Sequence, residues 1–171
     1  PGGAKDALAA YLNAFEPSPF CAQPYAGIGL VVLAADSDAE AERLSAPIKA
    51  WALGRGTGTF TPYLSTEEAT AYLAQAPLEA PERGIIGSAQ SVAQRLSETA
   101  QNCRANELFL LSITDHLDTR IESYRLIETA MMALNAETAY QLITGTIQTR
   151  PVSWIDQTTI RTPHQDGWHH P

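Results

Sequence analysis

Two uninterrupted apolar runs, each followed at once by a helical pattern, constrain the fold of this chain more than any other feature. PYAGIGLVVLAA (residues 24–35) and ELFLLSI (107–113) lack the alternation of a strand with one solvated face. Such runs are typical of strands covered on both faces, as in parallel sheets. A shorter apolar pair, Ile85 and Ile86, precedes another helical pattern. Strands that alternate with helices through short connections predict parallel βα units and an α/β fold.

Capping residues mark where the predicted helices begin. Ser37 with Glu40 forms an S-x-x-E capping box, and a second box opens a later helix at Ser65. Ser88 is placed as the N-cap of the helix after Ile86, and Pro47 should kink or restart an earlier helix. Apolar residues at helical spacing predict helices over 4–15, from 37 towards Leu53, over 66–76, 89–103 and 114–134.

The last predicted helix has the longest apolar face. Thr114 or Asp115 is expected to cap it. Its predicted buried face consists of Leu117, Ile121, Tyr124, Ile127, Met131 and Leu134. From Asn135 the periodicity decays into a segment rich in Thr, Gln and Pro, so we predict a domain over 1–134 and an irregular or disordered tail over 135–171. The histidines of that tail have no fixed geometry, and no metal site is expected there.

Composition narrows the choice of partners and compartment. The 171 residues include 11 basic and 19 acidic side chains, a net charge of −8, which argues against nucleic acid and anionic membranes as partners. The sequence shows neither a secretory segment nor an apolar run of membrane length. We therefore expect a cytoplasmic protein, in which Cys21 and Cys103 are reduced and buried.

Three parallel strands with long helical crossovers make an incomplete unit. A closed (β/α)₈ barrel takes about 250 residues. A doubly wound sheet usually has a Gly-rich first turn, which this sequence lacks. The chain opens with Pro-Gly-Gly and has no methionine before Met131, as expected of a piece of a longer protein or of a chain whose initiator was removed. The sequence therefore predicts the last part of something larger.

Four segments carry a resemblance to a known family. PGGAKDALAAYLNAFEPSP, PYAGIGLVVLAADSDAEAERL, GIIGSAQSVAQRL and NELFLLSITDHLDTRIESYRLI resemble, in that order, the carboxyl-terminal part of the bacterial luciferase-like monooxygenases. The match spans about residues 1 to 134. Its most specific pieces are AADSDAEAERL, the strand-GS-helix segment, and a D-H-x-x-x-R-x-x-S-Y run made by Asp115, His116, Arg120, Ser123 and Tyr124.

The resemblance implies a fold and a chemistry. The family consists of flavin-dependent oxidoreductases on a TIM barrel, so the chain would be an incomplete (β/α)₈ barrel, about the last three βα units. FMN, or a deazaflavin in a sister branch, would carry the redox chemistry on a small-molecule substrate, with oxygen as co-substrate of the monooxygenases. The family's amino-terminal portion, with the first five or so strands and most flavin phosphate contacts, has no counterpart here. Ser88-Ala89-Gln90 also replaces the family's common Ser-Pro-Glu.

Function in such barrels lies at the carboxyl ends of strands, here 35–37, 87–88 and 114–116. Gly87 and Ser88 could bind a cofactor phosphate at the start of their helix, or Ser88 could simply cap it. His116 could act as an acid, base or hydrogen-bond donor, or it could be solvated in the first helical turn. Arg120 is expected in a surface ion pair. No catalytic residue is assigned beyond these candidates.

Two functions from different classes remain open at this point. In the first, the chain is the carboxyl-terminal fragment of a flavin-dependent oxidoreductase or monooxygenase and is inactive alone, since three strands would leave sheet edges and an apolar interior exposed. In the second, it is a non-catalytic remnant or stand-alone α/β module that associates with a partner barrel or with a second copy of itself.

Overall fold

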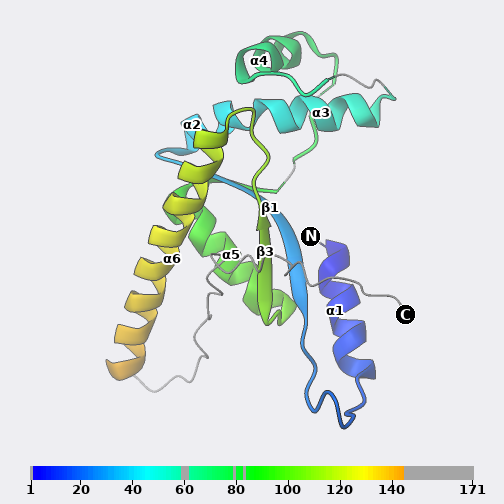
Figure 1. Cartoon of the computed structure of the whole chain (residues 1–171), viewed down its shortest axis with the longest axis vertical. Helices are drawn as coiled ribbons and strands as arrows, with labels where there is room; N and C mark the ends of the chain where they lie inside the picture. Colours follow the sequence, from blue (N-terminus) through cyan, green and yellow to red (C-terminus); the bar gives the residue numbers. More distant parts are fainter. Residues whose placement is uncertain (1, 59–61, 79, 83, 145–171) are drawn as a thin grey trace, which may run out of the picture.

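The computed structural model describes residues 2–58, 62–78, 80–82 and 84–144. It is a mixed α/β structure (Figure 1). The elements in chain order are α1 (Gly2–Ala14), β1 (Gly27–Ala35), α2 (Asp38–Leu44), α3 (Ala46–Gly56), α4 (Thr66–Gln75), β2 (Ile85–Ser88), α5 (Ala89–Cys103), β3 (Glu107–Leu111) and α6 (Leu117–Thr144). The predicted strands and helices are therefore confirmed as elements. No helix in the described ranges is both long and apolar enough to cross a membrane.

The three strands form one parallel sheet with β1 in the centre, in the order β2-β1-β3. β3 pairs with the first half of β1, from Gly27 opposite Glu107 to Val31 opposite Leu111. β2 pairs with its second half, beginning with Val32 opposite Ile85. Consecutive units of a closed barrel are neighbours in chain order, whereas an order of 2-1-3 occurs in doubly wound sheets. The structure shows a partial α/β fold and does not show a barrel.

One face of the sheet holds the main hydrophobic core. α5 and α6 cover that face, and Leu96, Ile127 and Met131 are almost completely buried there. The core cluster consists of Val32, Ala34, Ile85, Val92, Ala93, Leu96, Ile127 and Met131. Burial of this apolar surface is the main source of stability for such a unit.

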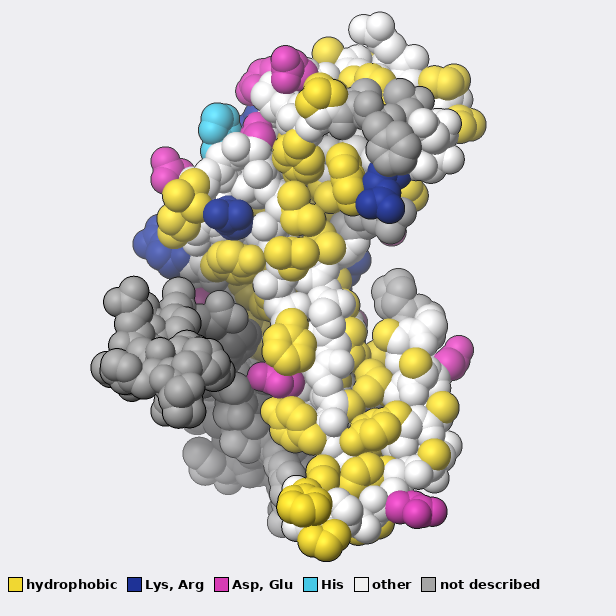
Figure 2. Space-filling model, turned by 45° about the vertical axis from the view of Figure 1, so that its right-hand side comes forward, with side chains coloured by type: hydrophobic (Ala, Val, Ile, Leu, Met, Phe, Trp, Pro, Cys, Tyr) yellow, Lys and Arg dark blue, Asp and Glu magenta, His cyan; other side chains and the backbone are white. Residues whose placement is uncertain are grey.

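The first half of the sheet is open on its other face. The side chains of Phe109 and Leu111 are 55% and 53% exposed, and Gly27 and Gly29 of β1 are exposed as well. The prediction that both apolar runs are covered on both faces is wrong for this half, because no described helix packs against it. Figure 2 shows hydrophobic side chains open to solvent along the middle of the molecule.

The buried stripe of α6 differs from the predicted one. Ser123, Ile127 and Met131 are buried at intervals of four residues. Leu117 and Ile121, which lie off this stripe, are more than half exposed. The predicted face was therefore wrong in its first half: a polar side chain, Ser123, continues the stripe towards the sheet.

A second, smaller cluster joins α3 and α4. Ala46, Ala50 and Ala69 are buried between the two helices. The break predicted near Pro47 is confirmed, since α2 ends at Leu44 and α3 restarts after Ser45. The capping box at Ser65 is also confirmed, with both reciprocal hydrogen bonds present.

Three local predictions need correction. Ser37 accepts a hydrogen bond from the backbone N–H of Glu40, but the Glu40 carboxylate pairs with Arg43 and the box is not reciprocal. Cys103 is buried as predicted, whereas Cys21 is exposed because it lies in a turn before β1. α6 continues to Thr144, so the predicted boundary at residue 134 falls inside a helix. The rest of the predicted tail, 145–171, lies outside the described residues.

Candidate functional site at the carboxyl ends of the strands

The start of α5 is already occupied by a carboxylate of this chain. The backbone N–H of Ser88 donates to Oδ1 of Asp38 at 2.6 Å, and a Cβ built on Gly87 would lie 2.9 Å from the same oxygen. This hydrogen bond holds the pKa of Asp38 below its ordinary value. Ser88 stands at the predicted N-cap position, but its side chain makes no capping hydrogen bond. Asp38, from the first turn of α2, instead accepts from the N–H of Ser88 itself, one of the backbone donors that a helix start leaves free.

The surface beside this helix start is polar and shallow. A depression of about 310 Å³ is lined by Ser88, Gln90, Ser91, Gln94, Arg95 and Glu98. The Arg95 guanidinium donates to the carbonyl oxygen of Ile86 at 3.1 Å, which ties it to β2. Ligand pockets are mostly apolar with a few convergent polar groups, and this depression does not have that character.

These residues do not fit the phosphate of a flavin. An anion binds a helix start through free backbone N–H groups and the positive end of the helix dipole. Here the N–H of Ser88 is used by Asp38, whose negative charge would repel a second anion. Gly87 and Ser88 thus lie at the expected edge of the sheet, but the backbone N–H of Ser88 binds Asp38 of the same chain.

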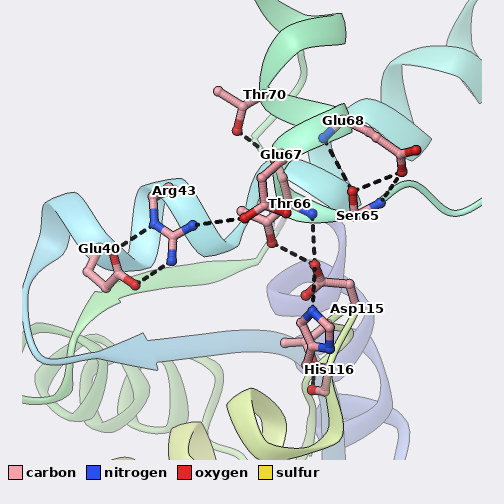
Figure 3. A network of polar contacts seen from close by, with 10 residues as sticks. Glu40, Arg43, Ser65, Thr66, Glu67, Glu68, Thr70, Asp115 and His116 are labelled. Carbon is pink, nitrogen blue, oxygen red and sulfur yellow. Dashed lines mark hydrogen bonds and ion pairs between the residues drawn. The ribbon is translucent and has the colours of Figure 1, made fainter.

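The β3–α6 loop meets the start of α4 through Asp115 (Figure 3). Oδ2 of Asp115 accepts hydrogen bonds from the backbone N–H of Thr66 at 2.7 Å and from its hydroxyl at 2.8 Å. The hydroxyl of Thr114 donates to the carbonyl oxygen of His116. Neither predicted residue therefore caps α6: Asp115 serves another helix, because the loop brings it against the first turn of α4.

Asp115 is nearly buried, and one of its oxygens is unsatisfied. Its side chain is 9% exposed, and Oδ1 has no hydrogen-bond partner among the described residues. Burial acts to raise the pKa of Asp115, but the hydrogen bonds from Thr66 outweigh it, and the pKa lies below its ordinary value. A buried acceptor without a donor is costly, so this carboxylate is held in place at some expense.

His116 lies where the sequence places it, beyond the end of β3, but it is not enclosed. Its side chain is 76% exposed, and Nε2 lies 3.8 Å from Oδ2 of Asp115. Within the described ranges, no three His, Cys, Asp or Glu side chains are arranged to hold a metal ion. A catalytic role for His116 stays a prediction.

Tyr63 belongs to this region and was missed in the sequence. Its hydroxyl donates to the carbonyl oxygen of Ile113 at 3.0 Å. Burial, together with the nearby charge of Asp115, raises the pKa of Tyr63 to about 12. The only sequence signal was its place two residues before the capping box at Ser65, and that signal does not reveal which loop the side chain meets.

Polar side chains from the end of β3 and from α6 brace the sheet. The hydroxyl of Ser123 accepts from the backbone N–H of Ala34 at 2.9 Å, and Ser112 donates its hydroxyl to the carbonyl oxygen of Val32 at 2.7 Å. The Tyr124 hydroxyl accepts from the N–H of Ser112 at 2.9 Å. Ser112 and Ser123 thus hold the half of β1 that β3 does not pair with, and Tyr124 holds Ser112.

The surface ion pair expected for Arg120 does not occur among the described residues. Glu122 pairs with Arg125 at 2.8 Å rather than with Arg120. Arg120 is exposed, and its backbone N–H donates to the carbonyl oxygen of His116 at 3.3 Å. Its side chain therefore gives no geometric reason to place it in a site.

Comparison with known proteins gives similarity to parts of longer chains. No protein-family model matches the sequence. Over 134 residues the chain is 27% identical to YwcH and 31% identical to YceB, two Bacillus subtilis (strain 168) proteins described as uncharacterized. The crystal structure of apo-MsnO8 is similar over 75% of this chain and 41% of its own, with a TM-score of 0.69 and 26% identity. The matches to YwcH and YceB cover 75% of this chain but only 40% of each relative, so the chain corresponds to less than half of either protein.

Proposed function

We propose that this chain is the carboxyl-terminal portion of a flavin-dependent oxidoreductase of the luciferase-like class, part of a (β/α)₈ TIM barrel. The observation that carries the proposal is the one-sided first half of the sheet. In such a barrel the helices lie outside and the opposite face of each strand points inward. α5 and α6 cover one face here, and Phe109 and Leu111 project from the other. An apolar face of this kind favours a structure that further strands complete.

The similarity to longer proteins supports the same proposal. The relatives continue beyond the matched region for the larger part of their length, which leaves room for the remaining strands. Barrel closure would require β3 to lie beside β2, whereas it lies beside β1 in this chain. The proposal therefore includes a rearrangement: when the other strands are present, β3 pairs with β2 instead of with β1.

In the proposed enzyme the flavin supplies the redox chemistry when bound, as FMN or a deazaflavin. The start of α5 does not fit its phosphate, so the proposal assigns phosphate binding to the rest of the barrel. This chain would contribute the carboxyl ends of three strands and the loop with Asp115 and His116. The substrate would be a small molecule, and the compartment the cytoplasm.

A chimera with a relative tests the proposal. YceB is first purified and its visible absorption measured for bound flavin, and the matching 134 residues are then replaced by those of this chain. We expect a yellow YceB and a folded, yellow chimera. A colourless YceB would remove the flavin from the proposal, and a folded but colourless chimera would show that this chain cannot complete the site. A chimera that carries Leu111→Asp on the inward face is the matched control, and it should not fold.

A second function, a stand-alone module without catalysis, is favoured by two observations. The strand order β2-β1-β3 differs from the order of consecutive strands in a barrel, and Asp38 occupies the start of α5. Under this alternative the purified 171-residue chain is monodisperse, and it is colourless after incubation with FMN and removal of the unbound FMN by gel filtration. A stoichiometric yellow chain would exclude it.

A further inference from the structure

Helix α4 is joined to the sheet side of the molecule by few polar contacts. One of them is an ion pair between Glu67 in its first turn and Arg43 of α2, at 3.9 Å between exposed side chains, which any movement of α4 must also break. The helix packs on α3 through a cluster of its own, separate from the core that α5 and α6 form with the sheet. Its first turn meets the β3–α6 loop through the two hydrogen bonds between Thr66 and Asp115. Just before the helix, Tyr63 adds the hydrogen bond to Ile113. Figure 1 shows α3 and α4 together at one end of the molecule, beyond the carboxyl ends of β1 and β3.

The first turn of α4 does not depend on Asp115 for its cap. The hydroxyl of Ser65 accepts from the N–H of Glu68, and the Glu68 carboxylate accepts from the N–H of Ser65 at 3.0 Å. This reciprocal pair satisfies two backbone donors that a helix start otherwise leaves free. The helix can therefore keep its first turn when Asp115 is removed.

Asp115 would gain hydration if the contact opened. In the closed arrangement Oδ1 is buried without a donor, while Oδ2 holds Thr66. Opening breaks the hydrogen bonds to Thr66 but gives both oxygens access to water, so part of the loss is offset. Three other ionisable groups act on Asp115 at this junction: His116, Tyr63 and the Arg43 guanidinium of α2. A contact balanced in this way has a low free energy of opening.

We propose that Asp115 is a latch, and that the α3–α4 pair swings away from the β3–α6 loop as an intact unit when the hydrogen bonds to Thr66 break. The pair is separated from α2 by Ser45 alone, at the break between the two helices. Opening uncovers Ile113 and Asp115, the two residues of the β3–α6 loop that bind Tyr63 and Thr66. The latch is a property of this chain by itself and does not rest on the proposed flavin chemistry.

Residue-resolved hydrogen exchange on the full 171-residue chain tests the latch. Asp115→Ala should speed exchange of the Thr66 amide at least about tenfold, because its acceptor is lost. The amides of Ala50 and Ala69, within the pair, and of Leu96, in the main core, should keep their protection. Asp118→Ala, an exposed aspartate in the first turn of α6, is the matched control and should change none of them.

Each alternative outcome overturns the latch. Unchanged exchange at Thr66 would mean that Asp115 does not hold α4. Faster exchange at Leu96 as well would mean that Asp115 stabilises the whole fold, and faster exchange at Ala69 alone would mean that α4 melts rather than moves.

Spin labels give a second measurement of the movement. Labels are placed at the exposed positions Ala74 of α4 and Glu128 of α6, each changed to cysteine. Cys21 is replaced by serine because it is exposed, while the buried Cys103 is left in place. Asp115→Ala should broaden the distance distribution between the labels towards longer distances. A distribution identical to that of the chain with Asp115 present would overturn the movement.

Discussion

The hydroxyl oxygen of Ser123 on α6 accepts a hydrogen bond from the backbone N–H of Ala34 in β1 at 2.9 Å, and both residues are buried. β3 stops pairing with β1 at Val31, so this part of the strand has no backbone partner on that side. A side chain thus takes the place of a neighbouring strand.

Removing that hydroxyl should destabilise the protein. Ser123→Ala leaves the Ala34 N–H buried without an acceptor, which we expect to lower the free energy of unfolding by about 1–3 kcal/mol. Urea denaturation followed by circular dichroism measures the change. Thr129→Ala, on the exposed side of the same helix, should stay within about 0.5 kcal/mol. Equal losses of unfolding free energy in the two variants would contradict a stabilising role for the Ser123–Ala34 hydrogen bond.

A leucine-to-alanine substitution should cost more stability in the core on the covered face of the sheet than on its open face. Leu96→Ala removes a side chain with no exposed surface and should cost about 2–5 kcal/mol. Leu111→Ala, at 53% exposure, should cost less than about 1 kcal/mol in this chain alone. Denaturation midpoints of the two variants measure the difference. A large loss for Leu111→Ala would mean that something covers the open face.

Gly84 is required by its backbone conformation and its surroundings. Its φ is +88°, and an added Cβ would lie 2.2 Å from the carbonyl oxygen of Val31, too close for any real contact. Gly84→Ala should therefore lower the free energy of unfolding by more than about 1 kcal/mol. Gly29→Ala is the control, since its Cβ would meet no atom within 4 Å. If both variants unfold at the same denaturant concentration, Gly84 does not lie as close to the backbone of Val31 as the structure shows.

Asp38 should make stability depend on pH in the acid range. Its pKa is lowered from 3.8 by the hydrogen bond from the Ser88 backbone, so the ionised form is favoured in the folded state. Its contribution is present above that ordinary value and is lost as the pH falls through the lower, folded value. In Asp38→Ala the unfolding midpoint should fall less steeply on acidification than in the unchanged protein. An NMR titration that places the Asp38 carboxyl at or above its ordinary pKa would refute this.

Tyr63 should act at the opposite end of the pH scale. Burial raises its pKa from 10.0 to about 12, so the folded state favours the neutral phenol. That contribution is complete below the ordinary pKa and is lost as the pH rises from 10.0 towards about 12. The difference in tyrosinate absorbance between the unchanged protein and Tyr63→Phe isolates this group. A midpoint at the ordinary value would show that neither partial burial nor the charge of Asp115 acts on the Tyr63 hydroxyl.

Local patterns predicted the elements well because they depend on residues close in sequence. The Ser65 capping box, the restart near Pro47 and the short strand at Ile85 are all set by neighbours within a few positions. The partners across the fold were not accessible in this way. Asp115 was expected to cap its own helix, yet Thr66 lies 49 positions away and offers two donors at once. Asp38 likewise reaches Ser88 over 50 positions.

The open face could not be read from the apolar runs themselves. A strand covered on both faces and a strand that awaits a partner on one face have the same composition, so Phe109 and Leu111 looked like ordinary core residues. The strand order could not be predicted for a similar reason. Periodicity determines which residues share a face of a strand, but it does not determine which strands are neighbours in the sheet.

The fastening of β1 at both ends has a consequence for synthesis of the chain. Asn106 binds the backbone of Ala26 at the start of the strand, and Ser112 and Ser123 bind it near the end, over separations of 80 and 89 residues. β1 therefore leaves the ribosome long before Asn106, Ser112 and Ser123 do. Its apolar residues stay exposed to solvent until Ser123 has been synthesised. Contacts between residues so distant in sequence slow folding and prolong the exposure of aggregation-prone apolar surface. Yield from a cell should consequently depend on chaperones that shield this one strand during translation.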